Sequence, residues 1–186
     1  MYWSWEKGMS EIRKVDDELS LVPYYPAYDI TLSWYQDPET CRMCDNDDTP
    51  YDLERLKKMY GYLERNGDSF YIVYRDRLIG DIALQDKGEI SIMLVKEFRS
   101  RHIGRKCVRE ILALAKEKGM KEVRARIYPF NIPSRKMFLT CGFRKRDEEE
   151  YVYVFPERAS QIRRRSIPQA DIDMLVLDRY EEEMLD

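Results

Sequence analysis

The stretch from residue 94 to residue 114 decides the fold of this chain, and it reads LVKEFRSRHIGRKCVREILAL. A strand-like run ends, an arginine-rich turn follows, and an amphipathic helix begins at Gly104. The start of this helix carries the cations Arg99, Arg101, Arg105 and Lys106. The positive end of a helix dipole disfavours each of them by roughly 0.3–1 kcal/mol. Their presence indicates an external anion, bound by free backbone N–H groups and by the cations; the alternative is a solvated basic turn.

Length and composition are those of an ordinary soluble protein of one domain. A chain of 186 residues can bury roughly 70% of its unfolded surface without disulfides or metals. The net charge of −3 argues against a general nucleic-acid binder, and no apolar run approaches the roughly 20 residues of a membrane span. A single C-x-x-C pair lacks the second ligand pair of a structural zinc site, so no metal is expected. Without a disulfide scaffold or a signal-like N-terminus, the expected setting is cytoplasmic.

Hydrophobic periodicity predicts a mixed order of strands and helices. Strands are expected at residues 19–25, 70–74, 78–84, 89–95, 122–128, 143–146 and 150–155. Helices are expected at residues 28–35, ended by Pro38, at 51–65, from Gly104 to Gly119, and at 131–141. The three strands after residue 69 predict an antiparallel meander, and the strand–helix–strand unit around Gly104 predicts one parallel crossover. Residues 1–18 are expected to be a polar extension, 19–155 the domain, and 156–186 a charged tail.

Two segments together resemble the GNAT family, the Gcn5-related N-acetyltransferases. RSRHIGRKC is similar to that family's [Q/R]-x-x-G-x-[G/A] signature for the acetyl-CoA pyrophosphate, and NIPSRKMFLTCGF is similar to its later N-x-x-[A/S] segment ending in G-F. The resemblance covers residues 19–155. It implies a single α/β (α+β) domain with a mixed, mostly antiparallel sheet of roughly six to seven strands and about four flanking helices. In two departures, His102 replaces the first glycine of the signature, and Phe138 stands where many members place a tyrosine that protonates the departing thiolate.

The resemblance implies direct transfer of an acetyl group from acetyl-CoA to a primary amine. An oxyanion donor, typically worth about 2.7–4 kcal/mol of barrier, is expected at the Val95 N–H. An amine of pKa about 10.4 is mostly protonated at pH 7 and needs a base. Glu89 is the candidate base, with a surface acid as the alternative, and Tyr128 is expected to line the acceptor side or to relay a proton. The residues expected to bind the cofactor are Met93, Leu94, Val95, Arg99, Ser100, Arg101, His102, Ile103, Gly104, Arg105, Asn131 and Ser134.

The acceptor side is less well specified by the sequence. Trp34, Tyr35 and Asp37 begin a segment that weakly resembles members acting on aminoglycosides or protein N-termini, and they are the candidate substrate-binding residues. The acidic loop at 45–48 would attract a cation, although a solvated loop is the alternative. The expected partner is an aminoglycoside-like, polyamine-like or peptide amine, and a homodimer is a further option. The competing hypothesis is an acyl-CoA-binding module without turnover. Asn131 has a helix cap as its alternative role.

Overall fold

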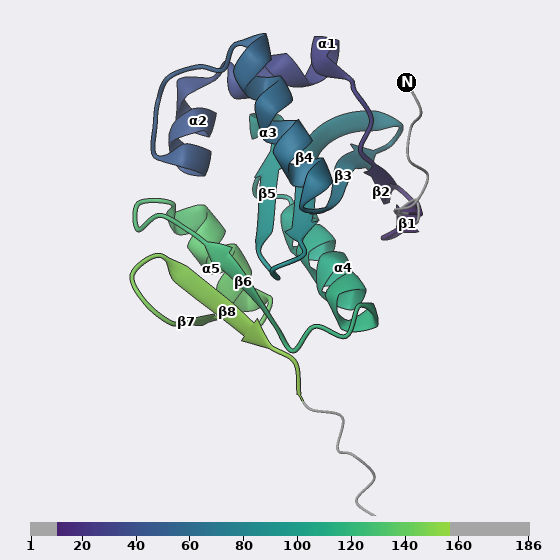
Figure 1. Ribbon diagram of the computed structural model, residues 1–186, viewed down its shortest axis with the longest axis vertical. Coiled ribbons are helices and arrows are strands. Elements are labelled where there is room, and N and C mark those ends of the chain that lie inside the picture. Colours follow the sequence, from purple (N-terminus) through teal and green to yellow (C-terminus); the bar gives the residue numbers. More distant parts are fainter. Residues whose placement is uncertain (1–10, 157–186) are drawn as a thin grey trace, which may run out of the picture. The chain divides into compact units, whose positions relative to one another are not determined.

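The computed structural model describes residues 11–156 (Figure 1). The predicted charged tail lies outside this range except for Pro156, and so do residues 1–10 of the predicted extension. The boundaries expected for these segments stay predictions. Within the described range, no helix has both the length and the apolar character that crossing a membrane requires.

The first sheet is an antiparallel sheet of five strands in the order β1-β2-β3-β4-β5. Its strands are β1 (Arg13–Lys14), β2 (Leu19–Pro23), β3 (Gly67–Tyr74), β4 (Arg77–Gln85) and β5 (Ile90–Leu94). The predicted meander of β3, β4 and β5 is confirmed. Arg75 and Asp76 form the tight turn between β3 and β4 with φ angles of 47° and 60°, the left-handed values that suit a two-residue hairpin. Strand β1 was not predicted, because two residues carry no periodic signal.

The second sheet holds three strands in the order β6-β8-β7, and it corrects the expectation of one continuous sheet. Its strands are β6 (Glu122–Arg126), β7 (Arg144–Lys145) and β8 (Glu150–Val154). An isolated parallel bridge joins the two sheets, between Glu89 and Arg124, and the Arg124 N–H donates to the Gly88 carbonyl at 2.8 Å. Sheet twist rotates neighbouring strands by roughly 20–25°. Beyond this bridge β5 and β6 form no ladder, and they belong to separate sheets.

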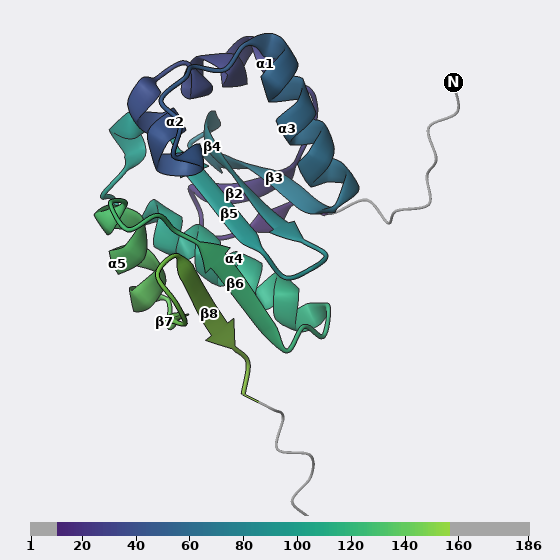
Figure 2. The same ribbon diagram turned by 60° about the vertical axis from the view of Figure 1, so that its left-hand side comes forward.

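The helices surround the first sheet on both faces (Figures 1 and 2). They are α1 (Tyr28–Thr31), η1 (Leu32–Tyr35), α2 (Pro38–Asp45), α3 (Leu53–Arg65), η2 (Lys96–Phe98), α4 (Ile103–Glu117) and α5 (Ile132–Thr140). The predicted helical segment at residues 28–35 is confirmed as α1 and η1, but Pro38, which was expected only to end that segment, also opens α2. Asp37 caps this helix by accepting from the Thr40 N–H at 3.0 Å, and the fixed φ of proline suits a first turn.

Two separate clusters of buried residues lie on the two faces of the first sheet. The apolar core, on the α4 side, is formed mainly by aliphatic side chains of β2–β6, α4 and α5, for example Ile72, Ile82, Leu84, Val108 and Ile111. The tyrosine core, on the side of α1, α2 and α3, contains Trp34, Tyr35, Tyr51, Leu56, Tyr60, Tyr71 and Met93. Odd-numbered residues of β5 face the tyrosine core and even-numbered ones face the apolar core, as strand alternation requires.

Candidate functional site

The loop between β5 and α4 has a backbone shape suited to an anion. Ser100 and His102 both have φ of 62°, in the left-handed region that side chains other than glycine rarely adopt. Alternation of left-handed and ordinary residues turns successive N–H groups toward one point and creates a concave anion site. The left-handed φ at His102 shows that this residue adopts a backbone conformation typical of the glycine that it replaces.

The first turn of α4 leaves its N–H groups open. His102 is the cap residue but its side chain makes no capping hydrogen bond, and the first bond within the helix runs from the Lys106 N–H to the His102 carbonyl at 3.3 Å. Within residues 11–156, no protein acceptor binds the N–H groups of Ile103, Gly104 and Arg105. Such groups are the usual anion-binding donors at a helix start.

The cations of this segment have different surroundings. Arg99 is held by protein atoms, because its Nε donates to the Leu94 carbonyl at 2.9 Å and its Nη2 donates to Thr40 Oγ1 at 2.8 Å. Arg101 lies over the ring of Phe98, and Lys106 forms an ion pair with Asp16 at 2.6 Å. Arg105 makes no ion pair with any residue that the structure describes. Arg99 thus links β5 to α2 through hydrogen bonds. Arg101 and Arg105 are the cations with fewer protein partners.

Gly104 is the position of closest packing between α4 and its neighbours. A Cβ atom added there would lie 2.7 Å from Met137 Sδ on α5 and 3.3 Å from Leu94 Cδ1 on β5. A real Cβ does not approach another heavy atom that closely, so a side chain would force Met137 to move. The glycine therefore lets α4 start directly against β5 and α5, which brings the open N–H groups next to the end of β5.

The hydrogen-bond register of β5 corrects the prediction for Val95. The Val95 N–H donates to the Ile79 carbonyl of β4 at 2.9 Å, so it is used inside the sheet and is not free for an oxyanion. In an antiparallel ladder the direction of the N–H groups alternates along the strand. Val95 and Met93 therefore point their N–H groups toward β4, and Leu94 points its own away from β4, toward the side of β6. The Val95 N–H is therefore not available as the expected oxyanion donor.

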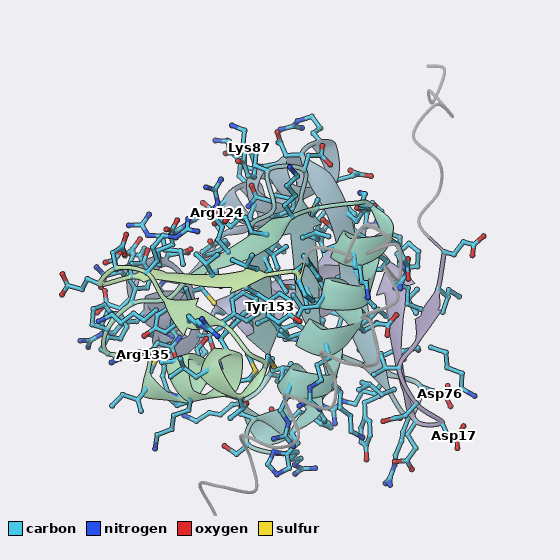
Figure 3. The ribbon with its side chains drawn as sticks, turned by 90° about the horizontal axis from the view of Figure 1, so that it is seen from below. Asp17, Asp76, Lys87, Arg124, Arg135 and Tyr153 are labelled. Atoms are coloured by element: carbon cyan, nitrogen blue, oxygen red, sulfur yellow. The ribbon has the colours of Figure 1, made fainter. Side chains whose placement is uncertain are left out.

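The predicted base, Glu89, lies at the opposite end of β5. Six residues of extended chain separate it from Val95, which is about 20 Å at 3.3 Å per residue. It lines a polar hollow of about 360 Å³ together with Arg124, Ala125, Arg126, Asp147, Glu149 and Glu150. Arg124 lies beside Lys87 at this end, where it donates to the Lys87 carbonyl at 3.4 Å (Figure 3). Glu89 and a donor at the end of β5 are too far apart to act on one acetyl group.

Tyr128 and Asn131 lie at the same end of the molecule as the loop. The Tyr128 ring stacks on Phe130 at 5.6 Å with an angle of 6°. Asn131 caps α5 by accepting from the Ser134 N–H at 3.2 Å, and its Nδ2 donates to the Met43 carbonyl of α2 at 3.2 Å. The capping role that sequence left open for Asn131 is therefore confirmed.

The predicted substrate residues have structural surroundings. Trp34 is 7% exposed and packs edge-on against Tyr71, and Tyr35 is 3% exposed. Asp37 accepts from Thr40 Oγ1 at 2.7 Å as well as from the Thr40 N–H, and these bonds hold the pKa of its carboxyl below the usual value. Of the three, only Tyr35 directs its polar atom toward a further acidic group.

That acidic group, Asp81 on β4, was missed by the sequence analysis. Its side chain is 9% exposed, and Oδ2 accepts from both the Tyr35 and the Tyr60 hydroxyls at 2.8 Å. Burial raises the pKa of Asp81 to about 6, against the lowering effect of the two tyrosines. Its cross-strand partner on β5 is Met93. The available signal was the sequence IGDIAL, where a lone acid interrupts an otherwise apolar strand.

Comparison with known proteins agrees with this arrangement. The sequence profile of the acetyltransferase (GNAT) domain matches residues 18–144. The chain belongs to the GNAT acetyltransferase family. The structure resembles a domain from Methanocaldococcus jannaschii, with a TM-score of 0.67 at 24% identity over 75% of this chain and 100% of that one.

Two further solved structures show the same GNAT fold. One is the acetyltransferase from Salmonella typhimurium that modifies the N-terminal serine of ribosomal protein L7/L12, with a TM-score of 0.64, 12% identity, and 78% and 100% of the two chains covered. The other is the microcin C7 self-immunity acetyltransferase MccE, solved with acetyl-CoA and AMP, with a TM-score of 0.59, 15% identity, and 76% and 95% covered. At these identities the likeness concerns the fold.

Within the GNAT fold, the departure at Phe138 has a packing reason. Phe138 is 2% exposed and packs edge-on against Phe143 at 4.9 Å, inside the apolar core. A hydroxyl at this position would need a partner among apolar side chains, and an unpaired buried hydroxyl destabilises the fold by about 1–3 kcal/mol. A thiolate-protonating tyrosine therefore cannot be carried over to this position.

Proposed function

We propose that this protein is an acetyl-CoA-dependent N-acetyltransferase that acetylates a primary amine directly. The observation that carries the proposal is the open backbone between residues 99 and 105, where left-handed residues precede an uncapped helix start. Acetyl-CoA would supply an acetyl group on an activated thioester. The N–H groups of Ile103, Gly104 and Arg105 would bind its diphosphate, with Ser100, Arg101 and His102 completing the concave loop.

The end of β5 supports a specific role for Leu94. Its N–H points away from β4 and toward the side of β6, and it lies close to Gly104. We assign the oxyanion contact to this N–H in place of that of Val95. A backbone donor in a fixed sheet needs no reorganisation during the reaction, and one such donor is typically worth about 2.7–4 kcal/mol.

Asn131 and Ser134 would line the path of the cofactor arm on the α5 side. The first-turn N–H of Ser134 is already used by the Asn131 cap, so the group of Ser134 left for a ligand is its hydroxyl. Tyr128 keeps its proposed role at the acceptor side, because it stacks on Phe130, whose ring contacts Arg42 of α2. Arg99 would act by holding Leu94 and α2 in place.

The acceptor is proposed to be a peptide amine or a small cationic amine. The Salmonella relative acts on a protein N-terminus, which supports the peptide class, whereas MccE acts in immunity to microcin C7. The acidic loop offers less attraction than its sequence suggested, because Arg55 pairs with Asp45 at 3.3 Å and with Asp47 at 3.2 Å.

A competing function, an acyl-CoA-binding module without turnover, is favoured by the buried Phe138. One experiment separates the two. The full chain is incubated with acetyl-CoA and, in separate reactions, spermidine, kanamycin and a peptide with a free N-terminal serine, and free thiol is measured against a no-amine control. The proposal expects thiol release above the control with at least one amine, together with CoA binding by calorimetry. CoA binding without release from any amine would establish the module.

CoA binding itself can be tested at Gly104. A Gly104→Val variant would place a branched side chain against Met137 and Leu94 and displace the helix start. We expect at least about a tenfold loss of CoA affinity, equivalent to 1.4 kcal/mol. Gly61→Ala on α3, where a Cβ would meet only the flexible end of Arg65, is the matched control and should bind CoA like the parent. Unchanged affinity in Gly104→Val would contradict the diphosphate site.

A further inference from the structure

The tyrosine core contains a carboxylate that has no counter-cation. Asp81 forms no ion pair with any residue in the described range, and its polar partners are the two tyrosine hydroxyls, both on Oδ2. Its other oxygen, Oδ1, accepts no hydrogen bond from residues 11–156. A buried carboxylate is strongly destabilised unless it is paired or fully hydrogen-bonded. Asp81 is therefore a buried carboxylate without a cationic partner among the described residues.

Asp81 is close to the end of β5 where the reaction is proposed to occur. It pairs across the strands with Met93, and residues paired in this way lie about 5.5 Å apart at Cα. Met93 immediately precedes Leu94, whose N–H is the proposed oxyanion donor. Glu89, by comparison, is at the far end of the same strand.

On the side of α2, the charge of Asp81 acts on Cys44. Cys44 is exposed to solvent, yet burial by surrounding protein raises the pKa of its thiol to about 12, with the charge of Asp81 contributing. Because Cys44 is exposed and lies close enough to Asp81 for the carboxylate charge to act on its thiol, α2 is the side from which we expect an amine to reach Asp81. Asp81 itself keeps 9% of its surface exposed.

Further polar groups in the same core lack partners. The Tyr71 hydroxyl and Thr31 Oγ1 are buried and have no hydrogen-bond partner among the described residues. The titratable groups that feel the charge of Asp81 are Tyr35 on η1, Cys44 on α2, Tyr60 on α3 and Tyr71 on β3. All four are neutral near pH 7, because burial holds the pKa of each above its ordinary value. None of them can balance the carboxylate.

We propose that Asp81, held in place by Tyr35 and Tyr60, binds the acceptor amine as an ammonium ion and takes the proton that the amine must lose. This inference rests on the proposed function and names its acceptor class: a cationic aliphatic amine, with one positive charge delivered to Asp81 Oδ1. It replaces Glu89 as the proton acceptor.

The proton and bond changes balance as follows. The ammonium gives one proton to the Asp81 carboxylate, which leaves a neutral amine and a carboxylic acid. The amine nitrogen then forms a bond to the acetyl carbon as the carbon–sulfur bond breaks, and the sulfur takes the electron pair of that bond. The second nitrogen proton goes to the sulfur to give the thiol, and Asp81 returns its proton to solvent. The net change converts an ammonium ion and a thioester into an amide, a thiol and one proton.

The first test compares Asp81→Asn with Asp76→Asn, the same chemical change at an exposed turn. With the best amine of the panel, we expect Asp81→Asn to lower kcat/KM by about 100-fold or more, the usual range for a lost acid–base group. CoA affinity should stay within twofold of the parent, because Asp81 is not part of the diphosphate loop. Asp76→Asn should behave like the parent. Loss of less than threefold in Asp81→Asn, or an equal loss in Asp76→Asn, would overturn the inference.

The second test uses the pH profile, which a purely structural role would not move. Tyr60→Phe removes one hydrogen bond that stabilises the charged carboxylate, so the acid limb of kcat/KM should move to higher pH. Glu89→Gln should leave that limb where it is in the parent. An acid limb that moves in Glu89→Gln and stays fixed in Tyr60→Phe would assign the proton to Glu89 and overturn the inference.

The third test needs no turnover. The carboxyl ¹³C signal of Asp81 is titrated in the full-length parent with butylammonium chloride and, as a neutral isostere, with butan-1-ol. Butylammonium should lower the pKa of Asp81, and butan-1-ol should not. Equal effects of the two would overturn the inference. If the parent acetylates no amine of the panel, the proposed function fails, and this titration alone decides whether Asp81 binds an ammonium ion.

Discussion

The two clusters on the faces of the first sheet differ in chemistry although they share the same strands. The apolar core is built from aliphatic and aromatic side chains and contains no ionisable carboxyl group among its described members. The tyrosine core includes four tyrosine rings, and two of them donate to the buried Asp81. The Tyr71 hydroxyl and that of Thr31 have no hydrogen-bond partner among the described residues. The first cluster has the composition that maximises stability. The second contains polar groups that lower stability unless a ligand uses them.

The largest expected effect tests the apolar core. Ile111 is fully buried in the middle of α4, and Ile111→Ala should lower the free energy of unfolding by about 2–5 kcal/mol through lost burial and a residual cavity. Ile30→Ala, at a side chain that is 45% exposed, is the control and should change it by less than about 0.5 kcal/mol. Urea unfolding followed by circular dichroism measures both. Equal costs would show that the apolar core does not dominate stability.

The second prediction concerns how the buried Asp81 lowers the free energy of unfolding as pH rises. Burial raises the pKa of Asp81 from 3.8 to about 6, so the folded protein binds a proton that the unfolded chain releases. The free energy of unfolding should therefore fall as pH rises from about 4 to about 6 and stay lower above that range, by roughly 3 kcal/mol at 1.36 kcal/mol per pKa unit.

The Asp81→Asn variant removes this dependence. Its unfolding free energy should be flat across that pH interval as far as this site is concerned, and at pH 7 it should equal or exceed that of the parent by up to roughly 3 kcal/mol. Thermal unfolding at a series of pH values measures the difference. A variant clearly less stable than the parent at pH 7 would mean that the charged form stabilises the fold, and the contrast between the two cores would disappear.

A third prediction sharpens the comparison at the junction of α4, α5 and β5. Gly104→Ala should lower stability by about 1–3 kcal/mol, because its Cβ would lie 2.7 Å from Met137 Sδ. Combining it with Met137→Ala should recover part of this overpacking loss. Additive losses in the double variant would show that Met137 is not the obstacle.

The smallest expected effect lies within the tyrosine core. Tyr71→Phe removes a buried hydroxyl without a described partner, so stability should stay within about 0.5 kcal/mol of the parent or rise by up to about 1 kcal/mol. Tyr60→Phe removes a hydroxyl that is bonded to Asp81 and should be the less stable of the two. If Tyr71→Phe were instead the more damaging change, the hydroxyl would have a partner that this arrangement does not include.

Much of the fold was predictable because its strongest elements have clear periodicity. The meander of β3 to β5, the helix α3 and the helix α4 followed from alternating or helical apolar spacing and from the turns at Arg75–Asp76 and Gly88. Helix α2 was missed because Pro38 was interpreted as a stop, although Asp37 and Pro38 together form a start signal. The split into two sheets was not predicted, because β5 and β6 share a single bridge and no local sequence pattern indicates where strand pairing ends.

The sequence indicates which segments could form the candidate site. It does not indicate the strand register, which decides which backbone groups of those segments are free. The sequence indicated the loop whose backbone N–H groups are open in the structure, because cations at a helix start are a local signal. It placed the oxyanion donor at Val95, whose N–H is used inside the sheet, because strand pairing decides which N–H groups are free, and a shift of one residue reverses the direction of the N–H group. Asp81 was missed because its partners, Tyr35 and Tyr60, come from distant helices.

Arg99 connects the two halves of the proposed reaction. One edge of its guanidinium binds the last carbonyl of β5, and another binds Thr40, whose own hydroxyl donates to the residue that caps α2. A ligand that holds the loop in place will therefore also hold α2 in place, and thermodynamic linkage makes this assistance mutual. We expect each substrate to bind more tightly when the other is already present, so that Arg99→Ala would leave two sites that fill independently.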